Sequence, residues 1–279
     1  MGLDRIRQQP TVDHEVKPNR RKKGTSVKLV WPDLTSSIED VGGDRFLQIA
    51  DSFGWLNPHL SLTLRWMGDV VVKVRPTNTE WSKWKPSDPT SPHWYQPQHL
   101  ERLIAGYISN ERDITVREFV SEFHGLSGTA KQRRVLEATG LARERLSNLV
   151  HGRDLDHQKI ARLLAVMQQE SKPVKPMSLG IIGEEHFRRR FVALGCAMES
   201  FTYVKRIEVD DGLPELLETA FGWVPKEGKR RLVTGVNWSP GILNPFRELG
   251  QRGYGMDSVL ANLRVDNSEP VIVMMHLAT

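Results

Sequence analysis

Hydrophobic positions in the C-terminal third of the chain predict a unit of strands with one helix. Residues 214–221 and 231–236 are apolar runs of strand length, joined by a connection that ends in KEGKRR. Two such runs around a glycine-bearing connection predict an antiparallel hairpin. A short apolar helix opened by Asp257 follows, and 271–277 (VIVMMHL) is typical of a fully buried strand. We therefore expect a hairpin, a helix and a closing strand, in that order.

The N-terminal part carries different patterns. Residues 1–23 are polar and basic and predict an extended or poorly ordered segment, after which a Gly-Thr turn leads into a strand at 27–31. Apolar residues at helical spacing predict an amphipathic helix over 44–56. Alternation of apolar and polar residues around a Met-Gly-Asp turn predicts a strand pair over 60–74. The residues expected on the buried face of the helix are Phe46, Ile49, Ala50 and Phe53.

Residues 76–112 are rich in proline and tryptophan and show little periodicity, which predicts a linker that wraps a surface. We expect its tryptophans, Trp81, Trp84 and Trp94, to pin the linker onto the neighbouring domains. The alternative is that they stack on nucleic-acid bases.

Residues 113–172 change to short helical patterns separated by glycines. Thr115 and Glu118 have the spacing of a capping box. Gly140 suits the left-handed position that ends a helix, and Asp156 is a suitable N-cap. These signals predict a small all-helical domain. Its helices are expected to begin at Thr115, at Lys131, at Leu141 and after Asp156.

Composition restricts the class of protein. With 39% hydrophobic and 26% charged residues, the 279-residue chain resembles an ordinary soluble one, long enough for two modest domains. No run approaches the roughly 20 apolar residues of a membrane helix, and the N-terminus has no apolar signal core. The lone Cys196 excludes an intramolecular disulfide and fits a reducing compartment. We expect a cytoplasmic protein without a membrane partner.

Charge permits contact with nucleic acid. The formal net charge is +5 and the isoelectric point is near 9.3. A dense basic cluster lies in the helical region, and such side chains neutralise DNA phosphates. The alternative is that they are solvated helix faces. The candidate DNA-binding residues are Lys131, Arg133, Arg134, Arg143 and Arg145.

Short motifs near the C-terminus resemble the transducer domain of the topoisomerase VI B subunit and its bacterial relatives. Pro214, Glu218 and Gly222 match the first patterned strand of that family, and Asn237 and Pro240 match its Ala-Asn-Arg-x-Pro strand. Trp238 and Ser239 depart from the pattern. The LGIIGE segment is similar to the family's Leu-x-Pro-Ile-Gly-Glu opening of the transducer.

Further matches occur upstream in the order that the family shows. The segment WLNPHLSLTL is similar to the end of the family's ATPase domain, and PHWY resembles a Pro-His-Pro-Tyr-Gly segment. TVREFVSEF and ATGL are similar to the helix–two-turns–helix insert. The resemblance covers roughly residues 24–279, with several moderate motifs in sequence.

This resemblance implies an α+β fold in three parts after the basic segment 1–23. A remnant of the GHKL ATPase sheet is expected at 24–75, followed by the linker at 76–112. A small all-helical insert is expected at 113–172, and a ribosomal-S5-like β/α transducer domain at 173–279.

The resemblance implies ATP and Mg²⁺ as cofactors of the intact family. The Asn, Glu and Asp-x-Gly-x-Gly elements of that pocket do not occur before Gly24, so we expect the chain alone to bind neither and to lack ATPase activity. It is then a short relative or a truncated fragment. Gly24 and Thr25 resemble a late Gly-Thr-x-Val turn of the ATPase domain. Arg247 resembles the lysine that contacts the terminal phosphate, and the plain alternative is a surface arginine on a turn.

The function implied is that of a B-subunit-like component of an ATP-dependent type IIB DNA topoisomerase. Its partners would be a DNA-cleaving A-like subunit and double-stranded DNA, with a homodimer in the intact form. Two alternatives stay open. One is a DNA-binding or scaffold protein that acts through the helical insert without enzymatic activity. The other is a GHKL-type ATPase whose pocket is encoded just upstream.

Overall fold

The computed structural model describes most of the chain, and its ranges are 2–4, 9–11, 43–66, 69–151, 154–210, 212–241 and 255–279. The chain divides into two compact units, 1–41 and 42–279. In the first unit, β1 (Gly2–Asp4) pairs antiparallel with β2 (Gln9–Thr11). The expected Gly24-Thr25 turn, the strand at 27–31 and Arg247 lie outside the described residues.

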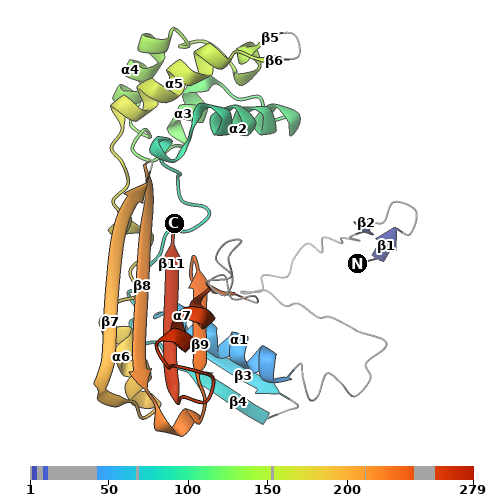
Figure 1. The fold of residues 1–279 in the computed structure, drawn as a ribbon. Coiled ribbons are helices and arrows are strands. Elements are labelled where there is room, and N and C mark those ends of the chain that lie inside the picture. The colour runs from blue at the N-terminus through green and yellow to red at the C-terminus, as the bar shows by residue number, and fades with distance from the viewer. Residues whose placement is uncertain are drawn as a thin grey trace. The chain divides into compact units, whose positions relative to one another are not determined.

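A five-stranded sheet organises the second unit, with the strand order β10-β9-β11-β8-β7 (Figure 1). The strand β11 lies in the middle, antiparallel to β8 on one side and parallel to β9 on the other. The strands of this sheet are β7 (Ala197–Asp210), β8 (Leu213–Trp223), β9 (Arg231–Val236), β10 (Ser239–Pro240) and β11 (Val271–Ala278).

The predicted hairpin between 214–221 and 231–236 is wrong, because β11 lies between these two strands. The most continuously apolar strand takes the central position, where neighbours cover both of its edges. Parallel pairing of β9 with β11 requires a long crossover, and residues 237–270 supply it. That crossover contains α7 (Met256–Asn262), which the sequence predicted.

Two helices pack against the sheet. In α6 (Glu184–Ala193), Phe187 and Phe191 are fully buried. The helix α1 (Gly43–Leu56) contacts β9 and β10, and its Trp55 ring meets Phe191 edge to face at 5.3 Å between centroids. The C-terminal end of α1 therefore belongs to the core of the five-stranded sheet rather than to a separate core.

The predicted buried face of α1 is partly wrong. Phe46 and Phe53 are 45% and 38% exposed, whereas Trp55 and Leu56 are almost completely buried. The C-terminal end of the helix, rather than one continuous stripe, meets the sheet. The predicted strand pair that follows is confirmed as the antiparallel pair β3 (Leu62–Trp66) and β4 (Asp69–Val74).

The tryptophan-rich segment packs as predicted, because its tryptophans lie against the sheet core. The linker is shorter than 76–112, since α2 (Pro97–Ser109) buries Leu100 and Ile104 in the helical core. The rings that pack against the sheet core are Trp81, Trp84 and Trp94.

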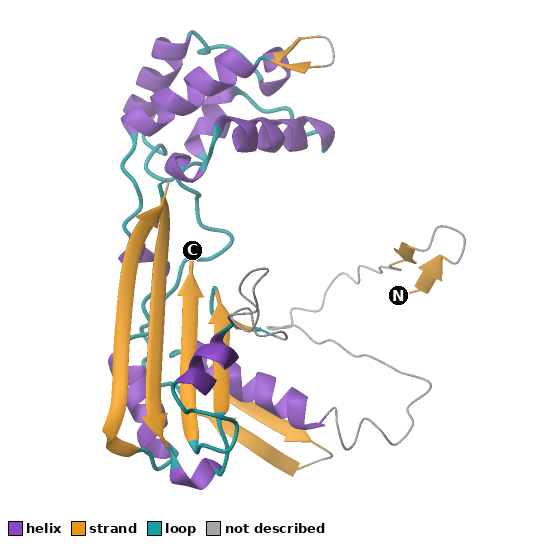
Figure 2. Cartoon of the chain, viewed as in Figure 1, coloured by secondary structure: helices purple, strands orange, loops and turns teal. Residues whose placement is uncertain are grey.

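The helical segment has its own hydrophobic core, and Figure 2 shows its helices in purple. Thr115 and Glu118 form the predicted capping box, Gly140 has a φ of +74°, and Asp156 accepts from Lys159 N. Its helices and short strands are α3 (Val116–Ser121), α4 (Thr129–Thr139), β5 (Val150–His151), β6 (Asp154–Leu155) and α5 (His157–Glu170).

The helix predicted over 141–150 is wrong. Its residues form a 3₁₀ turn at Leu146–Leu149 and then β5. The backbone there pairs with the segment before α3, since Val116 N donates to Glu144 O and Leu146 N donates to Ile114 O. This tertiary pairing replaces the i to i−4 bonds that a helix would use. Among the described residues, further 3₁₀ turns lie at Pro92–Trp94, Pro176–Leu179 and Pro225–Glu227.

The α+β fold class is confirmed by this mixture of helices and a largely antiparallel sheet. Within the part of the chain that the structure describes, no helix has the length and apolar character needed to cross a membrane.

The contact of α1 with the sheet can be tested at Gly235. A Cβ at this position would overlap the methyl groups of Leu56. We expect Gly235→Ala to lower the free energy of unfolding by about 1–3 kcal/mol through overpacking. Urea denaturation measures this, and Gly106→Ala, in open space within α2, is the control that should be neutral or stabilising. In the double variant Gly235→Ala/Leu56→Ala, the loss of unfolding free energy should be smaller than the sum of the losses in the two single variants. Strict additivity would contradict the contact.

Candidate functional site

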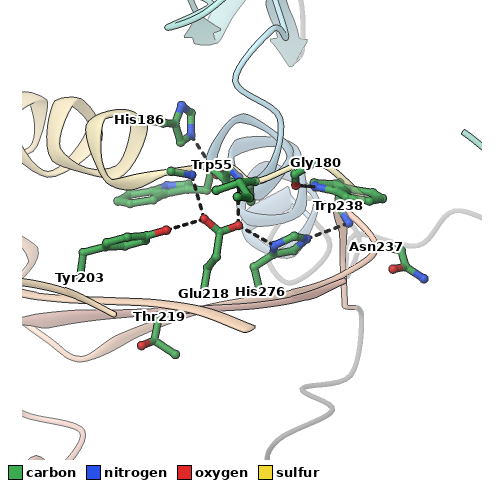
Figure 3. Close-up of polar contacts among 12 residues, drawn as sticks. Trp55, Gly180, His186, Tyr203, Glu218, Thr219, Asn237, Trp238 and His276 are labelled. Carbon is green, nitrogen blue, oxygen red and sulfur yellow. Dashed lines mark hydrogen bonds and ion pairs between the residues drawn. The ribbon is translucent and has the colours of Figure 1, made fainter. Parts of the chain in front are cut away.

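A buried carboxylate lies at the centre of the sheet. Glu218, on β8, is fully buried, and its oxygens accept four hydrogen bonds (Figure 3). Two come from the backbone before α6, from Ile182 N at 2.9 Å and Gly183 N at 2.8 Å. The others come from Tyr203 Oη on β7 at 2.7 Å and His276 Nδ1 on β11 at 3.3 Å. One side chain thus connects three strands with a helix.

The backbone at 182–183 is suited to this contact. Gly183 is the N-cap residue of α6 and has no side chain to cap the helix. Its φ of +89° favours glycine, and Glu218 supplies the capping carboxylate from a strand instead. A negative charge at a helix N-terminus also interacts favourably with the helix dipole.

Hydrogen bonding determines the ionisation of this network. Burial alone would raise the pKa of Glu218, but the bonds from His276, the two backbone amides and Tyr203 outweigh it and lower the pKa. Burial and the neighbouring carboxylate raise the pKa of Tyr203, which therefore stays protonated as a donor. Glu218 is accordingly an ionised carboxylate inside the protein.

His276 connects Glu218 with the turn after β9. Its Nε2 accepts from Trp238 N at 3.3 Å, so the ring proton lies on Nδ1 and points to Glu218. Asn237 and Trp238 form this turn with φ of +48° and +62°. Trp238 Nε1 donates to Gly180 O at 3.1 Å, which joins the turn to the segment before α6.

The end of α1 joins the same cluster. Asn57 Nδ2 donates to Trp238 O at 2.9 Å, and Asn57 Oδ1 accepts from Lys83 Nζ at 2.9 Å. Lys83 also lies over the Trp238 ring, 5.4 Å from its centroid, and burial lowers the pKa of its amine. Trp81 Nε1 donates to Ile181 O at 2.5 Å. The linker and α1 are therefore hydrogen-bonded to the segment before α6 and to the turn at Trp238.

His186 makes a second buried connection, from α6 to α1. Its Nε2 donates to Trp55 O at 2.9 Å, and its Nδ1 lies 2.5 Å from Thr77 Oγ1. Burial, together with the nearby Arg190, lowers the pKa of His186 to about 4. The imidazole is therefore neutral at physiological pH.

The arrangement serves to fasten segments rather than to perform catalysis. Glu218 and His276 have no exposed surface, so a substrate cannot reach them. Among the described residues, no group of His, Cys, Asp or Glu side chains is placed to hold a metal ion.

The predicted DNA-binding residues lie on the helical segment, apart from this network, and most have partners there. Arg133 pairs with Glu137 and Arg134 with Glu170, both at 2.7 Å. The remaining contacts are Lys131 Nζ with Gly125 O at 2.8 Å and Arg145 Nε with Asp113 at 3.1 Å. Arg143 forms no ion pair or hydrogen bond within the described ranges. Local carboxylates thus offset much of this basic cluster.

Sequence reasoning missed Tyr203, His186 and the role of Trp238. The alternation of residues around Tyr203 places it on the same sheet face as its partner, but pairing of β7 with β8 was not expected from the sequence. His186 lies in a charged stretch, where nothing in the local pattern indicates burial.

No family model matches the sequence, and no curated protein matches it.

The capping role of Glu218 can be tested by replacing its charge. We expect Glu218→Gln to lower the free energy of unfolding by about 3 kcal/mol, because the amide cannot accept from all of its donors and brings its own N–H groups against them. Chemical denaturation measures the loss. Glu215→Gln, a half-buried carboxylate on the same strand, is the control, and equal effects of both variants would contradict the assignment.

The buried His186 predicts an acid-dependent loss of stability. Its pKa is lowered in the folded state, so the unfolded chain binds the proton more tightly between about pH 6.5 and pH 4. Stability should therefore fall as the pH falls through this range, by about 3 kcal/mol from this group. Unfolding measured across pH should show a shallower fall for His186→Gln.

His157→Gln is the control for this pH experiment. Glu101 raises the pKa of the exposed His157, so its contribution has the opposite sign and is lost as the pH rises. A wild-type acid profile that His186→Gln leaves unchanged would show that the imidazole is not buried in the neutral form.

Proposed function

We propose that the chain is a topoisomerase VI B subunit-like component that passes ATP-driven motion to a DNA-cleaving partner. In this proposal it is not catalytic alone. ATP and Mg²⁺ would be bound by a separate GHKL ATPase region, and an A-like subunit would cut the DNA.

The observation that carries the proposal is the convergence of the resembling segments. The LGIIGE segment, Glu218 on β8 and the turn that begins at Asn237 come from separate parts of the sequence, yet they meet at one hydrogen-bonded cluster. The Asn57 end of the WLNPHL segment and His276 near the end of β11 join the same cluster. This convergence supports the proposal, because the segments that carry the resemblance form one hydrogen-bonded unit.

The strands that carry the motifs, β8 and β9, are not direct neighbours in the sheet. The paired strands that the motifs suggested are separated by β11, so the support comes from the side-chain cluster and not from direct pairing of β8 with β9. Both strands still contact the same central strand.

The cluster suggests how such a component would transmit motion. The turn at 237–240 leads into the segment that holds Arg247, the proposed phosphate contact. A displacement of that segment would pass through Trp238 to His276 and Glu218, and from there to α6 and β8. Buried hydrogen bonds that cannot exchange with water favour movement of these elements as one body.

The scaffold alternative has less support. In a DNA-binding insert the exposed Arg133, Arg134 and Arg145 would have to exchange their carboxylate partners for phosphates, which reduces the net positive charge that the helical segment offers to DNA. We therefore propose a protein partner as the main contact of this chain, with DNA bound by the assembly.

Reconstitution with an A-like cleaving subunit and a GHKL nucleotide-binding region from the same genome tests this function. We expect a stable complex that relaxes supercoiled DNA only with ATP, and we expect Arg247→Ala to reduce that activity by roughly tenfold or more, as the loss of one phosphate-contacting charge does in related chemistry. Lys226→Ala, an exposed lysine in the turn after β8, is the control that should retain activity.

Failure to bind the A-like subunit would contradict the proposal. Salt-sensitive binding of DNA by the isolated chain, weakened by Arg143→Glu, would instead support the scaffold alternative.

A further inference from the structure

An outer strand of the sheet is open to a partner. Among the described strands, β7 pairs only with β8, so its other edge carries unpaired backbone groups (Figure 1). Pairing with β8 is regular from Thr202 to Asp210. Residues 204–210 are exposed, including Val204 at 47%, Ile207 at 39% and Val209 at 56%. A long exposed edge of this kind, on which apolar and charged side chains are mixed, is a template for another strand.

The charges on this edge do not protect it against a second copy. Natural edges are guarded by charges, which repel an identical strand when they have one sign. In residues 204–210 the two cations, Lys205 and Arg206, are balanced by two anions, Glu208 and Asp210. The strand is therefore neutral as a whole.

The order of these charges is self-complementary around Ile207. In an antiparallel pair of two copies with a two-fold axis at Ile207, this residue faces itself. Arg206 then lies opposite Glu208 of the second copy on both sides of the axis. Cross-strand pairs of opposite charge stabilise such a ladder. On the other face of the strand, Val209 lies opposite the alkyl stem of Lys205.

We propose that β7 forms a homodimer by antiparallel pairing with β7 of a second copy, in the register centred on Ile207. This joins the two sheets of the pair into one continuous sheet. The contact is independent of the proposed topoisomerase function and of any dimer that a nucleotide-binding region would form. Because only one strand from each copy takes part, the interface is small and the dimer is weak and concentration-dependent.

Cysteine cross-linking tests the register. In a Cys196→Ser background, Ile207→Cys places two thiols across the axis with Cα atoms about 4.5–5.5 Å apart, within the range of a disulfide. Val209→Cys, on the same face, places the two thiols about 13 Å apart along the strand, out of range. We expect the first variant to form a covalent dimer under mild oxidation and the second to stay monomeric. Equal cross-linking of both variants, or of neither, overturns the proposed register.

Charge reversal tests the pairing without a covalent bond. We expect Arg206→Glu to weaken the dimer by roughly tenfold or more in sedimentation equilibrium, because it places like charges opposite each other twice. The swap of Arg206→Glu with Glu208→Arg should restore wild-type association. These side chains are exposed, so circular dichroism should be unchanged in every variant. A wild-type chain that stays monomeric at all concentrations, forms open-ended aggregates, or dimerises without sensitivity to Arg206→Glu overturns the proposal.

Discussion

The arrangement of the second unit depends on one carboxylate that is ionised without contact with water. A buried charge is costly unless hydrogen bonds replace its hydration, and Glu218 receives four of them. Two come from the backbone at the start of α6 and two from strands on either side of β8. The positions of the helix and the three strands are therefore coupled, since displacing any of them leaves part of the charge unsatisfied.

Further hydrogen bonds connect Glu218 to more distant segments of the second unit. His276 relays the network to Trp238, and Trp238 reaches the segment before α6 as well as Asn57 at the end of α1. The helical segment has a separate hydrophobic core, which is closed by apolar side chains and by capping at its helix ends. A polar network thus specifies the sheet, whereas the helices rely on periodic apolar packing.

This difference explains which features could be predicted from the sequence. The capping box at Thr115, the C-terminal Gly140 and the N-cap Asp156 follow from local spacing, and all are confirmed. The pairing of β11 between β8 and β9 depends on contacts distant in sequence, and the local hairpin signal was misleading. Of the central cluster, Glu218 and Asn237 were identified by resemblance. Tyr203 and His186 lie in stretches whose local pattern does not indicate burial.

Amide hydrogen exchange at Ile182 and Gly183 tests the central claim most directly. Both N–H groups lie at a helix start, where amides without a partner exchange rapidly with solvent. If Glu218 holds them, they exchange as slowly as the amides of β11 in the native protein, and they become fast in Glu218→Gln while the amides of α4 keep their rates. Rapid exchange of Ile182 and Gly183 in the native protein would contradict the account.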